Sequence, residues 1–171
     1  MIYHGASSRA MRSPADSYQA ILAAPFASLG LRATDEALTE IVFLGKPGAV
    51  LAPQNRLAER ACAQLRRYID DPLFHFDLPL APRGTPFQRR VWQKIAAIPP
   101  GATRSYGELA RELGSAARAV GQACGANPLP LVVPCHRVLA AAGIGGFAHQ
   151  RGGFEITVKR WLLAHEGAAA P

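Results

Sequence analysis

The chain has 171 residues, enough for one full hydrophobic core or two small ones, and its 49% apolar and 18% charged content is typical of a globular protein. No run of 18 apolar residues is present, which excludes a membrane-spanning helix, and the arginines near the N-terminus are followed by no apolar stretch of the kind a secretory signal carries. The net charge of +7 arises after residue 82, where eleven basic side chains accompany four acidic ones, and this asymmetry favours a polyanion such as nucleic acid as a partner.

The first half of the chain reads as strands, one helix and a further strand. Three apolar runs separated by short turns, Tyr18–Ala24, Ser28–Ala33 and Leu38–Leu44, predict an antiparallel meander. The segment Asn55–Ile69 repeats its apolar residues at the spacing of one helix face, and the DDP sequence at 70–72 ends that helix. Phe74–Leu80 alternates apolar and polar residues, which predicts one more strand.

The second half begins after a linker, LAPRGT at Leu80–Thr85, where the charge balance also changes. Thr85 and Pro86 begin a helix whose apolar residues at 87, 91, 95 and 98 share one face, and PPGAT at 99–103 ends it. Ser105–Leu113 forms the next helix, because Ser105 and Glu108 stand at the spacing of a capping box.

A third short helix completes a helix-turn-helix pattern. Gly114 ends the preceding helix, Ser115 is expected to cap again, and Ala116–Ala126 is helical. Two short helices joined by a turn that contains glycine are typical of this motif. The helix AARAVGQACGA consists almost entirely of small residues. Small residues allow either tight packing on a neighbouring helix or a close approach to a nucleic-acid groove, and composition does not choose between the two.

An apolar run, LPLVVPCHRVLA, follows Asn127 and Pro128 and predicts a buried extended chain. After it comes a glycine-rich loop at 143–153, of the kind that frames a pocket. Glu155–Glu166 then forms the last helix.

Cys135 is the candidate reactive group in that run. A cysteine in a buried strand is ordinarily inert because burial raises the pKa of its thiol. Here His136 and Arg137 follow directly and place basic or cationic groups beside it, while Pro134 interrupts any strand ladder. If residues 131–139 are extended, Cys135 and His136 point to opposite faces. Proton transfer between them would then need a bridging water or a bend in the backbone.

A carboxylate usually fixes the tautomer of such a histidine. The C-terminal half offers four carboxylates, and composition does not choose among them: Glu108, Glu112, Glu155 and Glu166.

The other cysteines and the histidines argue against a metal or disulfide framework. The three cysteines, Cys62, Cys124 and Cys135, include no CxxC pair, which favours reduced thiols in the cytoplasm. Cys62 is either a packing residue or a surface thiol. The five histidines show no metal-ligand spacing, so we expect no metal site.

The segment NPLPLVVPCHRV closely resembles the O6-alkylguanine-DNA alkyltransferase family, as do GTPFQRRVW and IPPGATRSYGELA before it and WLLAHEG after it. The resemblance is strong over residues 84–167 and loose over 18–80. It implies an α+β fold of two domains. Residues 1–80 would form a ribonuclease H-like α/β domain with a small antiparallel sheet, disordered over 1–16. Residues 81–171 would form a mostly helical, winged-helix-like DNA-binding domain that carries the helix-turn-helix.

The same resemblance implies a role for each matching residue. Cys135 would accept the alkyl group, His136 would deprotonate it through a water, and Glu166 would orient His136. Asn127 would brace the turn before Cys135, Arg118 would fill the gap left by the flipped nucleotide, and Tyr106 would press on the phosphate that rotates the base out and would contact the base. The implied sets are the catalytic residues Cys135, His136, Glu166, Asn127 and Tyr106; the DNA-binding residues Arg118, Tyr106, Ser105, Ala119, Gly121 and Cys124; and the pocket residues Val138, Phe147 and Lys159. No metal ligand and no cofactor are implied.

The implied function is direct DNA repair. An alkyl group would pass once and irreversibly from O6-alkylguanine, or from O4-alkylthymine, in double-stranded DNA to Cys135. The target base would be flipped out by a helix-turn-helix in the minor groove, and a damaged pair costs less to open. We expect a monomer in the cytoplasm, associated with the nucleoid and not with a membrane.

This chain departs from the family pattern around the pocket. Phe147 stands where members often carry a tyrosine, the loop at 143–153 is longer, and Cys124 and Gly125 replace larger or basic residues. Three other functions fit less well. An alkyltransferase-like damage binder lacks the acceptor cysteine, a plain helix-turn-helix regulator gives the PCHR segment no purpose, and opposite-facing Cys135 and His136 argue against a thiol hydrolase.

Overall fold

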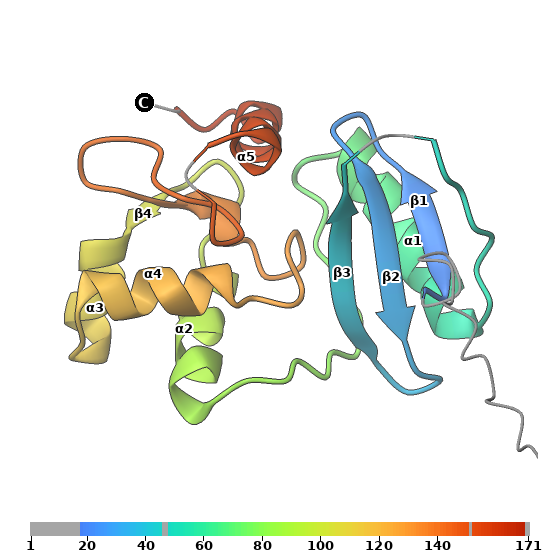
Figure 1. Cartoon of the computed structure of the whole chain (residues 1–171), viewed down its shortest axis with the longest axis horizontal. Coiled ribbons are helices and arrows are strands. Elements are labelled where there is room, and N and C mark those ends of the chain that lie inside the picture. The colour runs from blue at the N-terminus through green and yellow to red at the C-terminus, as the bar shows by residue number, and fades with distance from the viewer. Residues whose placement is uncertain (1–17, 46–47, 151, 170–171) are drawn as a thin grey trace, which may run out of the picture.

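The computed structural model describes residues 18–45, 48–150 and 152–169, and the expected disorder over residues 1–16 lies outside these ranges. Its first part is a three-stranded antiparallel sheet in the order β1-β2-β3, formed by β1 (Ala20–Ala23), β2 (Ser28–Ala33) and β3 (Leu38–Leu44). Helix α1 (Arg56–Asp70) packs against all three strands (Figure 1). The predicted meander and the predicted helix are therefore confirmed.

Helix α1 begins where a side chain satisfies its first free N–H groups. The carboxamide oxygen of Asn55 accepts a hydrogen bond from the N–H of Ala58 at 2.7 Å. The buried face of the helix carries apolar residues at helical spacing from Leu57 to Tyr68. Cys62 lies on this face and is only 2% exposed, so it is a packing residue and not a surface thiol.

The strand predicted over Phe74–Leu80 is wrong. The alternation is present in the burial pattern, but this stretch forms only one isolated bridge, between Leu38 and Leu80. Its polar backbone groups bond to side chains of α1 instead. The N–H of Asp77 donates to Gln64 at 2.8 Å, and the carbonyl of Asp77 accepts from Gln64 and Arg60. Apart from this pairing of its last residues with Leu38 of β3, the segment is extended along a helix and not along a strand.

The second part is mostly helical. It contains α2 (Pro86–Ala96), α3 (Tyr106–Leu113), α4 (Ala117–Gly125) and α5 (Phe154–His165). A two-stranded parallel pair, β4 (Arg104–Ser105) and β5 (Val138–Leu139), joins the start of α3 to the segment that follows Cys135. Figure 1 shows these helices on one side of the molecule and the sheet with α1 on the other. No helix among the described residues has the length and apolar character needed to cross a bilayer.

The predicted helix ends are confirmed at three residues and wrong at a fourth. Thr85 forms a capping box with Gln88, and Ser105 forms one with Glu108. Gly114 ends α3 in the left-handed conformation with φ of 61°, which glycine adopts without strain. Ser115 does not cap α4, because the helix begins one residue later and the capping position falls on Ala116, which has no side-chain acceptor.

One buried tryptophan ties α2 to α4. Trp92 is 4% exposed, and its indole N–H donates to the carbonyl of Ala123 at 2.8 Å. Gly84 lies against the ring so closely that a Cβ there would come within 2.4 Å of it. Ala123 of α4 is itself only 2% exposed, so small residues serve helix packing on at least one face of α4, which is the first of the two interpretations left open by composition.

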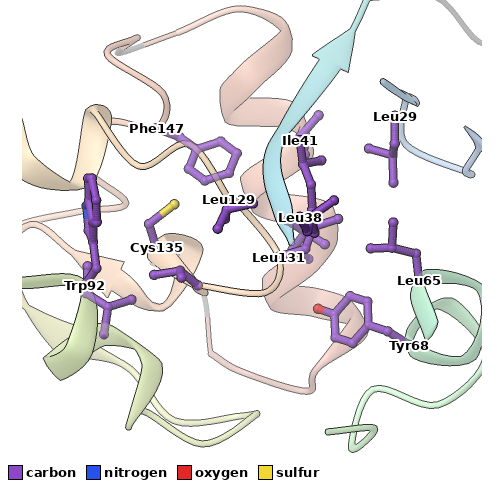
Figure 2. Packing of buried hydrophobic residues seen from close by; sticks show 14 of the residues in the cluster. Leu29, Leu38, Ile41, Leu65, Tyr68, Trp92, Leu129, Leu131, Cys135 and Phe147 are labelled. Atoms are coloured by element: carbon purple, nitrogen blue, oxygen red, sulfur yellow. The ribbon is translucent and has the colours of Figure 1, made fainter. Parts of the chain in front are cut away.

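The hydrophobic core is continuous across the two parts of the molecule. It runs from Leu29 and Leu38 of the sheet to Leu129, Leu131 and Cys135 (Figure 2). Backbone also crosses between the parts, since the N–H of Ile41 in β3 donates to the carbonyl of Pro128 at 2.8 Å. Cys135 is thus held where the N-terminal sheet meets the C-terminal helices. The division into domains at residues 80 and 81 stays a prediction.

Candidate active site

Cys135 begins a single turn of 3-10 helix, Cys135–Arg137, and the extended chain predicted over 131–139 is wrong except for Val138–Leu139. The backbone turns sharply before it. Leu131 has a positive φ of 74°, and the N–H of Val133 donates to the carbonyl of Leu129 at 2.8 Å. Prolines at 128, 130 and 134 have no N–H to give to a ladder, so apolar composition alone could not make this segment a strand.

The thiol of Cys135 is buried and held by Asn127. Cys135 is 5% exposed, and its Sγ accepts a hydrogen bond from Nδ2 of Asn127 at 3.3 Å. The same Nδ2 donates to the carbonyl of Val133 at 2.8 Å, while Oδ1 of Asn127 accepts from the N–H of Leu129 at 3.0 Å. Asn127 therefore braces the turn between α4 and Cys135. Burial raises the pKa of the Cys135 thiol, and the Asn127 bond and the nearby Lys159 oppose that rise only in part.

His136 is oriented by Glu166, one of the four carboxylates left open by the sequence. Nε2 of His136 lies 2.9 Å from Oε1 of Glu166, and both side chains are fully buried. Since a carboxylate accepts, Nε2 carries the proton and Nδ1 is the free acceptor. Nδ1 is buried and has no hydrogen-bond partner among the described residues. Burial lowers the pKa of His136 below its ordinary value despite the Glu166 contact, which keeps the imidazole neutral.

The sequence suggested that Arg137 lies beside the thiol. Its guanidinium faces the Glu166 carboxylate instead. Its Nε donates to Oε2 of Glu166 at 2.9 Å, and its terminal nitrogen donates to Oε1 at 2.7 Å. A further bond runs to the carbonyl of Ile98 at 2.5 Å. The 3-10 turn sends the imidazole and the guanidinium to one acceptor, which an extended strand would not do. Burial would raise the pKa of Glu166, but bonds from His136, Arg137 and Tyr68 hold it well below its usual range.

Lys159 and Tyr106 fix the glycine-rich loop beside the thiol. Lys159 is fully buried, and its Nζ donates to the carbonyls of Val138 at 2.7 Å and Gly146 at 2.9 Å. The hydroxyl of Tyr106 donates to the same Gly146 carbonyl at 3.1 Å. Burial lowers the pKa of Lys159 to about 8. Lys159 therefore ties the loop to Val138 and to α5, and Tyr106 ties it to the start of α3.

A cavity of about 1040 Å³ opens beside these groups. It is lined by six of the predicted site residues: Tyr106, Arg118, Gly121, Cys124, Cys135 and Phe147. Arg118 is exposed in the first turn of α4, and Cys124 is buried near the end of that helix. The sulfur of Cys135 points towards the ring of Phe147 (Figure 2). A smaller cavity of about 220 Å³, against β3, shares Cys124, Cys135 and Phe147 with the larger one.

The remaining predicted residues do not line the 1040 Å³ cavity, although Asn127 lines the smaller one. The hydroxyl of Ser105 accepts from the N–H of Glu108 in the capping box, which gives it a structural partner. Ala119 is half-buried on α4, and Val138 and Lys159 form the buried layer behind the loop. A role of Ser105 and Ala119 in binding DNA stays a prediction.

The sequence did not predict that two residues, Arg137 and Tyr68, donate hydrogen bonds to Glu166. The Tyr68 hydroxyl donates to Oε1 of Glu166 at 2.7 Å. These residues are 98 positions apart, and no local spacing signals such a contact.

Comparison with known proteins assigns the second half of the chain to one family. Residues 86–168 match the model described as "6-O-methylguanine DNA methyltransferase, DNA binding domain". A methylated-DNA–protein-cysteine methyltransferase of Methanosarcina acetivorans is 38% identical over 159 residues, which cover 88% of this chain and 99% of the relative. One from Mycobacterium bovis is 49% identical over 114 residues, which cover 65% of this chain and 66% of the relative.

Solved structures agree with these matches. The crystal structure of the Mycobacterium tuberculosis O6-methylguanine methyltransferase has a TM-score of 0.73 at 38% identity, covering 88% of this chain and 93% of that one. The Mycobacterium tuberculosis OGT in complex with DNA has a TM-score of 0.72 at 39% identity, with the same coverage. The arrangement of sheet and helices is therefore shared with proteins that are similar in sequence as well.

Proposed function

We propose that this chain, which belongs to the 6-O-methylguanine DNA methyltransferase family, repairs DNA by transferring an alkyl group from O6 of guanine to Sγ of its own Cys135. Its activity is that of a methylated-DNA–protein-cysteine methyltransferase. The observation that carries the assignment of roles is the buried chain of Cys135, His136 and Glu166 beside the large cavity. A nucleophile, a neutral base and a carboxylate that orients the base are the parts that thiol activation requires.

The proton of Cys135 leaves through His136. Because Nε2 of His136 is bonded to Glu166, the buried Nδ1 is the acceptor, and a water between Sγ and Nδ1 carries the proton. Glu166 stabilises the imidazolium that forms, as a carboxylate does for a catalytic histidine. The raised pKa of the thiol means that this deprotonation is needed near neutral pH.

The transfer itself is a displacement at the alkyl carbon. Sγ forms a bond to that carbon as its bond to O6 breaks, and the electron pair stays on the base, which takes up a proton at N1 to become guanine. The product is a thioether, and the alkyl group stays on Sγ because a thiolate is a poor leaving group from a saturated carbon. The protein therefore acts once.

The buried thiol requires a base outside the duplex. Cys135 is 5% exposed, and O6 of a stacked guanine cannot reach it, so the target nucleotide flips into the 1040 Å³ cavity. Exposed Arg118 at the cavity enters the duplex and fills the gap, while Tyr106 contacts the base and the phosphate that rotates it. The slim helix α4 lies in the minor groove, as the second helix of a helix-turn-helix.

We propose that this chain also has the domain types, the second substrate and the monomeric state that the family resemblance implies. The sheet with α1 is the ribonuclease H-like domain, and the helical part is the winged-helix-like domain that binds DNA. The pocket accepts O4-alkylthymine as well as O6-alkylguanine, because both present an alkylated oxygen next to a ring nitrogen. The protein acts as a monomer in the cytoplasm, on the nucleoid.

Stoichiometry tests the proposed function. A duplex oligonucleotide that contains one O6-methylguanine, in excess over protein, should yield one repaired guanine per protein molecule and then stop. Digestion of the oligonucleotide and chromatography of its nucleosides count the product. Repeated turnover would contradict the proposal and indicate a hydrolase, and binding without any repair would indicate a damage binder.

Arg118→Ala separates flipping from chemistry. We expect transfer from a duplex to slow about tenfold to hundredfold, because the variant no longer offsets the unstacking cost of a few kcal/mol. Transfer from the same lesion in a single strand, measured in the same single-turnover assay, should change little. Arg66→Ala removes an equal charge from the exposed face of α1 and is the control. Equal losses on both substrates would place Arg118 in general binding and not in flipping.

A further inference from the structure

A buried tyrosine of the N-terminal part reaches the carboxylate that orients the catalytic histidine. Tyr68 lies in the last turns of α1, is 1% exposed, and donates from its hydroxyl to Oε1 of Glu166 at 2.7 Å. Figure 2 shows the phenol oxygen pointing away from α1. No other hydrogen bond to the Glu166 carboxylate among the described residues comes from the N-terminal half.

The direction of this hydroxyl is fixed by its surroundings. The Tyr68 ring packs against Phe76 at 5.6 Å between centroids and meets His165 edge-on at 5.4 Å. The backbone carbonyl of Tyr68 lies 2.8 Å from Nε2 of His165, whose ring stacks on Trp161 at 4.7 Å. Aromatic contacts of this kind leave the ring little freedom, so the bond to Glu166 is built into the packing of α1 on α5.

One oxygen atom of Glu166 collects three donors. Oε1 accepts from Tyr68 at 2.7 Å, from Arg137 at 2.7 Å and from His136 at 2.9 Å. Burial and the Glu166 carboxylate raise the pKa of Tyr68 against an opposing effect of Arg137, so the phenol keeps its proton and donates it to Glu166. A third donor on the same oxygen weakens the acceptor that the His136 N–H meets, and it also stops the carboxylate from rotating.

We propose that Tyr68 is a positioning residue for alkyl transfer, through which the N-terminal part of the chain orients Glu166 and sets the strength of its hydrogen bond to His136. This inference rests on the proposed function, since it concerns the base of that reaction. Tyr68 lines neither cavity, so it acts on the reaction through the Glu166 carboxylate and not by contact with the substrate.

Tyr68→Phe removes the hydroxyl and keeps the ring. Without the third donor, Oε1 accepts more strongly from His136, which raises the pKa of the imidazole against the lowering effects of burial, Arg137 and Lys159. Because the carboxylate is then less firmly oriented towards His136, we expect the rate constant in single-turnover assays to fall on the order of tenfold, while the raised pKa of His136 moves the acid limb of the pH profile to higher pH. Phe74→Leu, which removes an edge-on aromatic contact with Phe76 and leaves the Phe76 ring against Tyr68, should lower the melting temperature and leave the profile in place.

A double-mutant cycle tests whether Tyr68 acts through Glu166. The Tyr68→Phe change should slow transfer in the wild type and have no further effect in the Glu166→Gln background. An equal loss in both backgrounds would overturn the inference, as would a Tyr68→Phe protein with lower stability but an unchanged pH profile. In either case the wild type would still become methylated on Cys135. A failure of the role proposed for Tyr68 can therefore be told apart from a failure of the proposed function.

Nitrogen NMR of His136 gives a readout that needs no activity. The titration of its ring nitrogens in Tyr68→Phe should show a raised pKa relative to the wild type. Wild-type chain labelled with 3-fluorotyrosine keeps the fold and gives the opposite test, because the more acidic phenol donates more strongly to Glu166 and should lower the pKa of His136. Identical titrations in all three samples would contradict a role for Tyr68.

Discussion

Cys135→Ala should lose all alkyl transfer and still bind a duplex that contains O6-methylguanine with affinity close to that of the wild type. Transfer needs the sulfur, and no other thiol among the described residues stands beside His136 and Glu166. Binding depends instead on α4 and on the cavity, where the substitution removes only one sulfur atom and leaves the other lining residues in place. Fluorescence anisotropy measures the binding, and quenched single-turnover reactions measure the transfer.

Cys62→Ala is the matched control for that variant. Cys62 is equally buried but lies in α1, outside both cavities. It should lose some stability and keep one transfer per molecule. If Cys135→Ala failed to bind the lesion while Cys62→Ala bound it, Cys135 would be a packing residue of the DNA site and not the acceptor.

Glu166→Gln should be the most damaging change away from the thiol. The carboxylate is fully buried and accepts two bonds from Arg137, so its loss leaves a guanidinium buried without its counter-charge. Breaking a buried pair in this way costs about 3–5 kcal/mol in the free energy of unfolding. The rate constant for transfer should also fall by about 100-fold or more, because His136 loses the group that fixes its tautomer.

The same variant changes how stability depends on pH. The pKa of Glu166 is lowered in the folded protein, so its contribution is fully present above the unfolded value of about 4.3 and is lost as pH falls below that value. Urea unfolding of Glu166→Gln should lack this loss. Glu112→Gln, at an exposed carboxylate paired with Lys94 and Arg104, should leave stability almost unchanged. A Glu166→Gln protein as stable and as fast as the wild type would contradict the assigned role.

The parts of the fold that the sequence predicts are those governed by local chemistry. The caps at Thr85, Ser105 and Gly114 act within four residues, and the helix and strand periods repeat within one element. The prediction of an extended chain before Cys135 was wrong because it rested on the apolar composition of the run. Three prolines and a positive φ at Leu131 make this segment a series of turns. The strand prediction over Phe74–Leu80 was wrong because an alternating pattern indicates which side chains are buried and does not indicate a partner strand.

The site residues also differ in whether the sequence can predict them. The thiol, the histidine and their order are visible in the PCHR motif, and resemblance to the family pointed to Glu166 and Asn127. The contacts of Arg137 and Tyr68 with Glu166 arise from a 3-10 turn and from the packing of α1 on α5, across 29 and 98 residues. Contacts of that range follow from tertiary structure alone.

The location of the transferred methyl group is the most direct test of the account. The protein would be incubated with a duplex that contains O6-methylguanine, and its intact mass and its peptides would be measured. We predict a gain of one methyl group per molecule, confined to the peptide that contains Cys135, with the peptides of Cys62 and Cys124 unchanged. A methyl group on another residue, or repaired DNA with no gain in protein mass, would contradict it.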